Sequence, residues 1–123
     1  MLTDTNVFVV EDDKTMIGLL KTLLEMEGCR VTSYVHPSDT PLLDTIRQIS
    51  PQVILMDVNL RDADGMEILQ SIRADDTLGN IRIIMSSGSD YKDLCLRLGA
   101  DDFLMKPYMP DDLIKMIKKA LSA

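Results

Sequence analysis

Five short apolar runs, rich in β-branched residues, recur along the chain between longer segments that carry helical periodicity. Short runs of this kind are typical of strands, and nearly continuous apolar character is expected where helices cover both faces of a parallel sheet. The pattern predicts strands over residues 7–10, 31–35, 53–56, 81–85 and 103–105.

The segments between these runs predict five helices. An apolar stripe at residues 17–24 indicates the first helix, which ends at Gly28, a residue type favoured just beyond a helix C-terminus. Thr40 and Pro41 predict the N-cap and first turn of the second helix, and residues 50–51 end it. The other three are predicted from apolar residues at 66–72 after Gly65, at 94–98 before Gly99, and at 113–121.

The alternation of strand and helix predicts an α/β fold. Such a chain forms a parallel sheet with right-handed crossovers and helices on both faces. A ligand site is then expected outside the carboxyl ends of the strands. The 123 residues fit one domain that spans residues 1–123.

The composition narrows the function classes. The 20 acidic and 13 basic residues give a formal charge of −7, which disfavours direct binding to nucleic acid or to an anionic membrane. Cys29 and Cys95 have neither CxxC spacing nor a nearby histidine, so we expect reduced structural thiols and no zinc site. No basic leader segment and no run approaching the ~20 apolar residues of a membrane span is present. We therefore expect a cytoplasmic location.

Four of the predicted strands are followed by polar residues that a parallel sheet brings to one edge. These are Glu11-Asp12-Asp13, Asp57, Ser86-Ser87 and Lys106. Closely spaced carboxylates repel, so protons or a hard cation must offset their charge. Mg²⁺ fits because it takes oxygen ligands and leaves positions open for a phosphoryl oxygen. The pattern predicts Asp57 as a nucleophile toward phosphorus, with Mg²⁺ and Lys106 neutralising the transferred group.

Four motifs in this order and strand context resemble the receiver domains of two-component response regulators, chemotaxis receivers among them. They are VVEDD at residues 9–13, DVNLRDADG at 57–65, MSSG at 85–88 and GADDFLMKP at 99–107. Each motif alone is weak, but the four together are specific. The resemblance covers nearly the whole chain. It implies a flavodoxin-like sheet with strand order 2-1-3-4-5 and a cis peptide bond between Lys106 and Pro107.

The resemblance implies a signalling switch that accepts a phosphoryl group on Asp57. The donor would be a histidine kinase or phosphotransfer protein in a phosphorelay. Asp12 and Asp57 would bind Mg²⁺ directly, together with the backbone carbonyl of Asn59, and Glu11 would act on the metal through water. The chain would then be no enzyme on a separate substrate, and would show only Mg²⁺-dependent self-phosphorylation and autodephosphorylation.

The resemblance also implies how the switch is transmitted. Ser87 would hydrogen-bond a phosphoryl oxygen, and Lys106 would pair with the phosphate. Phe103 stands at the switch-aromatic position and would turn inward on activation. The fourth helix, fifth strand and fifth helix would form the output surface, toward a partner or toward an output domain outside these residues.

Simpler roles are open for several of these residues. Asp57 can cap the following loop, Ser87 can bond a turn amide, and Lys106 can be an ordinary surface lysine. Asp13 fits a helix N-cap at least as well as a metal contact. His36 precedes a proline in a predicted loop, and we expect it to be solvent-exposed with no part in the site.

Two rival functions use the same fold. A constitutive docking module that ignores phosphate is disfavoured by the complete set of Asp12, Asp57, Ser87 and Lys106. A phosphohydrolase with an aspartyl nucleophile needs a second aspartate two positions after it, where Asn59 stands.

Three features depart from the receiver pattern. Arg61 replaces the usual proline four positions after the phosphoacceptor, and Gln52 replaces the usual aspartate that opens the third-strand run. We expect neither residue to touch the pocket. Ser87 and Lys106 are 19 positions apart, about three fewer than in most relatives, so roughly one turn of the fourth helix is expected to be missing.

Overall fold

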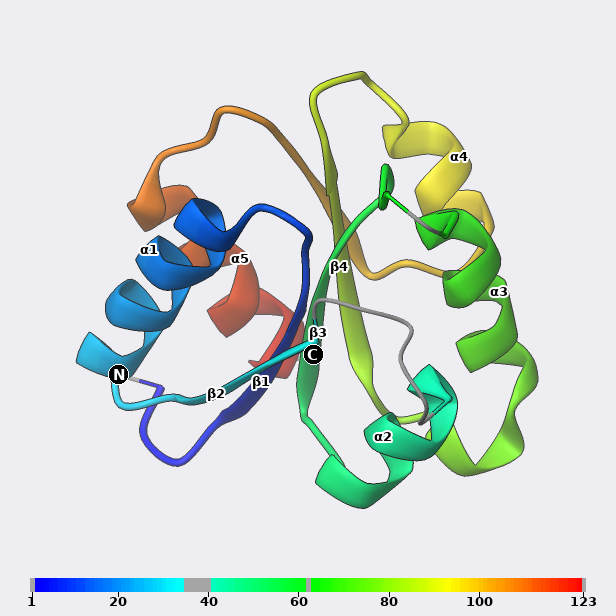
Figure 1. Ribbon diagram of the computed structural model, residues 1–123, viewed down its shortest axis with the longest axis horizontal. Coiled ribbons are helices and arrows are strands. Elements are labelled where there is room, and N and C mark those ends of the chain that lie inside the picture. Colours follow the sequence, from blue (N-terminus) through cyan, green and yellow to red (C-terminus); the bar gives the residue numbers. More distant parts are fainter. Residues whose placement is uncertain (1, 35–40, 62, 123) are drawn as a thin grey trace.

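The computed structural model describes residues 2–34, 41–61 and 63–122, which form a five-stranded parallel sheet with helices on both faces (Figure 1). The strand order is β2-β1-β3-β4-β5, which is the flavodoxin-like order that the resemblance implies. The strands are β1 (Asn6–Val10), β2 (Arg30–Tyr34), β3 (Val53–Asp57), β4 (Arg82–Ser87) and β5 (Asp102–Met105).

Within the described residues, five α-helices and a short 3₁₀-helix connect the strands. They are α1 (Lys14–Met26), α2 (Leu42–Ile49), α3 (Gly65–Ala74), η1 (Asp76–Leu78), α4 (Lys92–Arg97) and α5 (Pro110–Ser122). Figure 1 shows α1 and α5 on one face of the sheet and α2, α3 and α4 on the other. The short fourth helix that the sequence predicts is six residues long.

The predicted strands all form, with ends displaced by one or two residues. Residue 35 of the predicted second strand, His36 and Thr40 lie outside the described residues. α2 begins at Leu42 with Pro41 at the N-cap position, and no side chain caps it there. Gly65 is the first residue of α3, whereas the prediction placed it before the helix. η1 was not predicted.

The sheet separates two apolar cores. One lies beneath α2, α3 and α4 and contains Phe8 and Phe103, while the other lies beneath α1 and α5 and contains Leu24 and Ile117. Because consecutive strand residues point to opposite faces, Phe103 and its neighbour Leu104 belong to different cores.

Cys29 and Cys95 are buried free thiols, one in each core. Burial raises the pKa of both thiols, which disfavours the reactive thiolate form. None of the helices in the described part of the chain is long and apolar enough to span a membrane.

Candidate functional site

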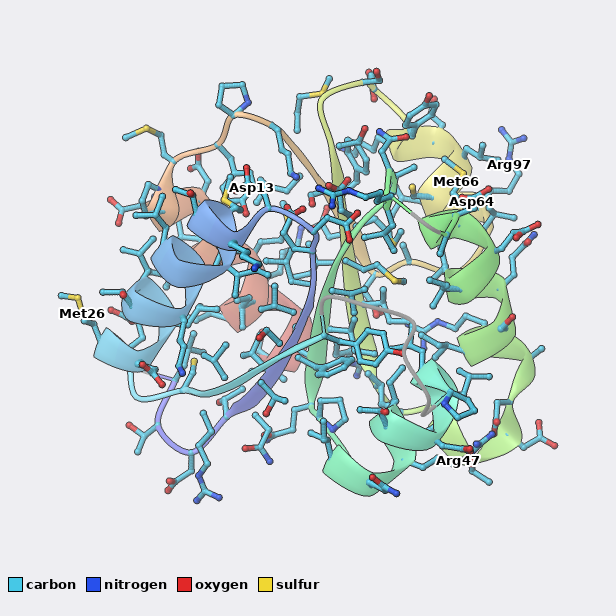
Figure 2. The ribbon with its side chains drawn as sticks, in the orientation of Figure 1. Asp13, Met26, Arg47, Asp64, Met66 and Arg97 are labelled. Carbon is cyan, nitrogen blue, oxygen red and sulfur yellow. The ribbon has the colours of Figure 1, made fainter. Side chains whose placement is uncertain are left out.

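The loops that follow β1, β3, β4 and β5 lie at one edge of the sheet, uppermost in Figure 1. Parallel strands bring their carboxyl ends together at this edge. Figure 2 shows Asp13 at the start of α1 and Asp64 at the start of α3, both near it. A pocket of about 810 Å³ opens between these loops, and its lining includes Glu11, Asp12, Asp57, Arg61 and Lys106.

Lys106 joins two acidic residues in this pocket. Its ammonium Nζ donates to Glu11 Oε1 at 2.7 Å and to Asp57 Oδ2 at 2.8 Å. Both acidic residues are buried, with 6% of Glu11 and 8% of Asp57 exposed. Burial by itself lowers the pKa of Lys106, but the hydrogen bonds and charges of Asp57 and Glu11 outweigh it and raise that pKa above its ordinary value. Lys106 is therefore a fixed cation in the pocket and not an ordinary surface lysine. Its peptide bond to Pro107 is cis, as the resemblance implies.

Glu11 also shapes the loop between β1 and α1. Its second oxygen, Oε2, accepts from the backbone N–H of Asp12 at 2.9 Å and of Asp13 at 3.3 Å. Asp13 in turn caps α1, because its side chain accepts from the N–H groups of Thr15 and Met16. The N-cap alternative for Asp13 is thus confirmed.

Asp57 is held where β3 ends. Its Oδ1 accepts from the backbone N–H of Asn59 at 3.0 Å. A Cβ atom at Gly65 would lie 2.2 Å from the carbonyl oxygen of Asp57, so only glycine allows α3 to begin this close to the strand end. Asp64 caps α3 by accepting from the N–H of Met66 at 2.9 Å. The start of α3 therefore fixes the backbone of the candidate nucleophile.

Ser87 ends β4 with 0% of its surface exposed. Its hydroxyl accepts from Asn59 Nδ2 at 3.0 Å and from the N–H of Ser89 at 3.1 Å. The bond from Ser89 is the turn-amide role anticipated as the simpler alternative. The bond from Asn59 was missed, because sequence spacing does not show a side-chain contact between two loops. A hydroxyl oxygen that accepts twice can still donate its proton to a third group.

Arg61 corrects one expectation. It lines the pocket, and its backbone N–H donates to Asp12 Oδ2, so the prediction that Arg61 would not touch the pocket is wrong. The physical reason is that arginine, unlike proline, has a backbone N–H to donate. Gln52 accepts from the N–H of Asn6 at 2.7 Å, at the opposite edge of the sheet, so that residue lies away from the pocket as predicted.

Two aromatic residues lie within three positions of Lys106 in the chain. Phe103 is 6% exposed and packs in the core beneath α2, α3 and α4, so its ring is already inward in this structure. Tyr108 was not singled out in the sequence, although it stands two positions after Lys106. Burial raises the pKa of Tyr108 to about 12, with Lys106 opposing the shift and Glu11 and Asp57 adding to it.

The residues available to bind Mg²⁺ carry the type of donor atom that this ion prefers. Asp12, Asp57 and the carbonyl of Asn59 are oxygen donors around a polar pocket, which is the donor set that a hard cation takes. In the described ranges, no three His, Cys, Asp or Glu side chains converge closely enough to hold a metal by themselves. Asp57 is bonded to Lys106, and Asp12 is bonded to the loop at Arg61.

A five-stranded flavodoxin-like sheet with acidic residues, a lysine and a buried serine at its carboxyl edge defines the receiver class of signalling domains. The chain matches the response regulator receiver domain family over residues 7–118 and belongs to that family. Receiver domains of two-component response regulators are signalling switches that accept phosphoryl groups and generally bind Mg²⁺.

Named relatives agree with this assignment. The chain is 32% identical over 116 residues to the transcriptional regulatory protein CssR of Bacillus subtilis, and 30% identical over 117 residues to the DNA-binding response regulator MtrA of Mycobacterium tuberculosis. Each alignment covers 94% of this chain and 50% of the relative, so the chain spans about half the length of these curated relatives.

Solved structures agree in fold. The signal receiver domain of a DNA binding response regulator from Colwellia psychrerythraea 34H gives a TM-score of 0.87 at 26% identity, covering 98% of this chain and 100% of that one. A CheY-like receiver domain protein from Methanospirillum hungatei JF-1 gives 0.85 at 28% identity, covering 98% and 95%.

Proposed function

We propose that Asp57 is the phosphoacceptor and that the donor is a phosphohistidine on a histidine kinase or phosphotransfer protein. The contact of 2.8 Å between Lys106 Nζ and Asp57 Oδ2 carries this proposal. It places a fixed ammonium beside a carboxylate that is buried yet lines an open pocket. A carboxylate in this setting is a nucleophile with its charge compensation already in position.

The transfer exchanges one bond to phosphorus for another. An oxygen of Asp57 attacks the phosphorus, the P–N bond to the donor imidazole breaks, and the electron pair leaves with the imidazole. Lys106 offsets the charge of the transferred oxygens. Water later hydrolyses the aspartyl phosphate, so the chain resets itself and acts on no separate substrate.

Asp12, Asp57 and the backbone carbonyl of Asn59 would hold Mg²⁺, with Glu11 acting through water. When bound, the ion supplies positive charge to the phosphoryl oxygens. Glu11 already binds Lys106 and the loop amides. Its part in this site is therefore to orient the groups that meet the phosphoryl group.

Ser87 and Phe103 would transmit the signal. A phosphorylated side chain carries about 1.5 to 2 negative charges, and the Ser87 hydroxyl can donate its proton to one of the new oxygens. Met85, two residues before Ser87 on β4, pairs in register with Phe103 on β5. Movement of the β4 end would thus reach the aromatic ring through its strand neighbour.

The output face would consist of α4, β5 and α5. Leu96 of α4, Met105 of β5 and Met109, which directly precedes α5, are exposed. It would meet a partner, or an output domain outside these residues. The net charge of −7 disfavours direct DNA contact by this domain, although MtrA is named a DNA-binding regulator. The cytoplasmic location stays a prediction.

The test is phosphorylation of the full chain by a small acyl phosphate with Mg²⁺, followed by intact-protein mass spectrometry. We expect one phosphoryl adduct on the wild type and on Asp112→Asn, an exposed carboxylate on α5 that serves as the matched control. Asp57→Asn should show none. An adduct on Asp57→Asn at the wild-type level would contradict the assignment.

A further inference from the structure

We propose that the Asn59 carboxamide covers the Ser87 hydroxyl, and that Ser87 meets a group in the pocket only after this side chain turns away. The inference rests on the proposed function, in which Ser87 bonds a phosphoryl oxygen. It deepens that function by naming the side chain that controls access to Ser87. Asn59 is therefore a positioning residue that acts through Ser87.

Ser87 and Asn59 differ in their exposure to the pocket. Ser87 is 0% exposed, and the pocket lining, taken over the described residues, includes Asn59 but not Ser87. Asn59 is itself exposed, and its Nδ2 donates to Ser87 Oγ at 3.0 Å. The Asn59 side chain therefore contacts both the pocket and the buried hydroxyl.

The two hydrogen bonds that Ser87 Oγ accepts come from different kinds of group. One comes from the backbone N–H of Ser89 at 3.1 Å, within the turn that follows β4. The other comes from the Asn59 side chain, so it can break without movement of the main chain. A serine hydroxyl has two acceptor lone pairs and one proton to donate, and the proton is not used by either bond.

The backbone of Asn59 is held in place, whereas its side chain has room to turn. The N–H of Asn59 donates to Asp57 Oδ1 at 3.0 Å, and the residue forms an isolated antiparallel bridge with Asp64. A second cavity of about 390 Å³ also has Asn59 in its lining, together with Tyr91 at the start of α4. Because Asn59 lines both cavities, rotation of its side chain is sufficient to uncover Ser87.

Chemical access to position 87 tests the cover directly. In Ser87→Cys, reaction of the introduced thiol with methyl methanethiosulfonate, a small thiol reagent, reports how often the position is open. We expect this reaction to be roughly two- to tenfold faster in Ser87→Cys/Asn59→Ala, since loss of a hydrogen bond between uncharged groups shifts an equilibrium by about that factor. Equal rates in the two variants would overturn the cover.

Two controls isolate the effect of the Asn59 side chain. Cys29 and Cys95 are buried free thiols, so the wild-type chain measures their background reaction. Asn80→Ala replaces an exposed asparagine just before β4 begins, at the other edge of the sheet, and it should leave the rate of Ser87→Cys unchanged. Equal acceleration by Asn80→Ala and Asn59→Ala would overturn the cover, because it would indicate general loosening of the fold.

Labelling by a small acyl phosphate with Mg²⁺ tests the cover without an introduced thiol. Asn59→Ala removes the carboxamide but keeps the backbone N–H that bonds Asp57 and the carbonyl proposed for Mg²⁺. We expect labelling roughly two- to tenfold faster than in the wild type, because the Ser87 hydroxyl no longer has to be released first. In a Ser87→Ala background, the same substitution should leave the rate unchanged. No acceleration, or equal acceleration in both backgrounds, would overturn the cover.

Asp57→Asn separates this proposal from the proposed function. If Asp57→Asn is not labelled while Asn59→Ala changes neither the thiol rate nor the labelling rate, the phosphoacceptor stands and the cover alone is wrong. If Asp57→Asn is labelled at the wild-type level, the proposed function is wrong, and the cover has no phosphoryl group to admit.

Discussion

Replacing Lys106 with methionine tests how much the Lys106 ammonium stabilises the two buried carboxylates of the pocket. The substitution keeps an unbranched side chain of similar length but removes the ammonium that bridges Glu11 and Asp57. Two buried carboxylates are then left without their cation, and desolvated charges without a partner are costly. We expect the metal-free variant to be markedly less stable than the wild type.

The expected loss in the free energy of unfolding follows from the hydrogen bonds that Lys106 makes. Lys106 makes two charge-assisted hydrogen bonds, at 2.7 and 2.8 Å, and each such bond contributes roughly 1.5–3 kcal/mol. The side chain is 22% exposed, so water replaces part of the lost interaction. A net loss of about 2–4 kcal/mol is expected, which lowers the melting temperature by roughly 6–20 °C for a domain of this size.

The assay is thermal and urea unfolding of the wild type, Lys106→Met, Asp57→Asn and the double variant, all without metal. Because Asp57→Asn removes one of the stranded charges, the double variant should lose less stability than the two single losses added together. Added Mg²⁺ should raise the melting temperature more in Lys106→Met than in the wild type, since the ion supplies the missing positive charge.

The pH dependence of stability tests the contribution of the Lys106 charge independently. The pKa of Lys106 lies above its ordinary value of 10.5 in the folded chain. Its stabilisation is therefore fully present below pH 10.5 and is lost as the pH rises through the folded pKa. The gap between wild type and Lys106→Met should narrow above pH 10.5. A variant as stable as the wild type at pH 7, or strictly additive losses, would refute the reasoning.

Three further predictions concern single positions. Gly65→Ala should cost roughly 1–3 kcal/mol in urea unfolding and slow acyl-phosphate labelling, because the new Cβ meets the Asp57 carbonyl; unchanged labelling would contradict this. Asn59→Met should lengthen the phosphorylated lifetime several-fold by excluding water beside Asp57, as a decay time course would show. Arg73→Met should cost roughly 2–4 kcal/mol, because the guanidinium bonds Gly99, Ile81 and Asp101. Its melting-temperature response to Mg²⁺ should match that of the wild type, and a lost response would show that the Arg73 contacts reach the pocket.

The sequence predicted β1, β3 and β4 well because their apolar runs are nearly continuous. β3 is buried along its whole length, so periodicity and composition agree there. η1 escaped prediction because three residues are too short for a periodic signal. The Asp75 side chain caps η1 by accepting from the N–H of Thr77. In the sequence, this segment shows only the polar composition of a loop.

The sequence predicted which residues line the candidate site, but it did not predict which of them bond to one another. Strand-end chemistry brought Glu11, Asp57 and Lys106 to one pocket, and the structure places them there. Which carboxylate meets the ammonium depends on loop geometry, and local sequence does not encode it. Arg61 shows the limit most clearly, since a main-chain donor is the same in every residue but proline and leaves no compositional mark.

The two cores on either side of the sheet give the chain two packing layers in which substitutions act separately. Leu113 and Ile117 of α5 pack beneath α1, on the face opposite Phe103. Substitutions in that layer can add or remove stability without altering the packing around the aromatic ring. The layer beneath α2, α3 and α4 has no such freedom, because Phe103 and the segment after Asp57 share it. Buried positions of the α1–α5 layer should therefore tolerate stabilising and destabilising substitutions with less effect on the candidate switch than positions around Phe103.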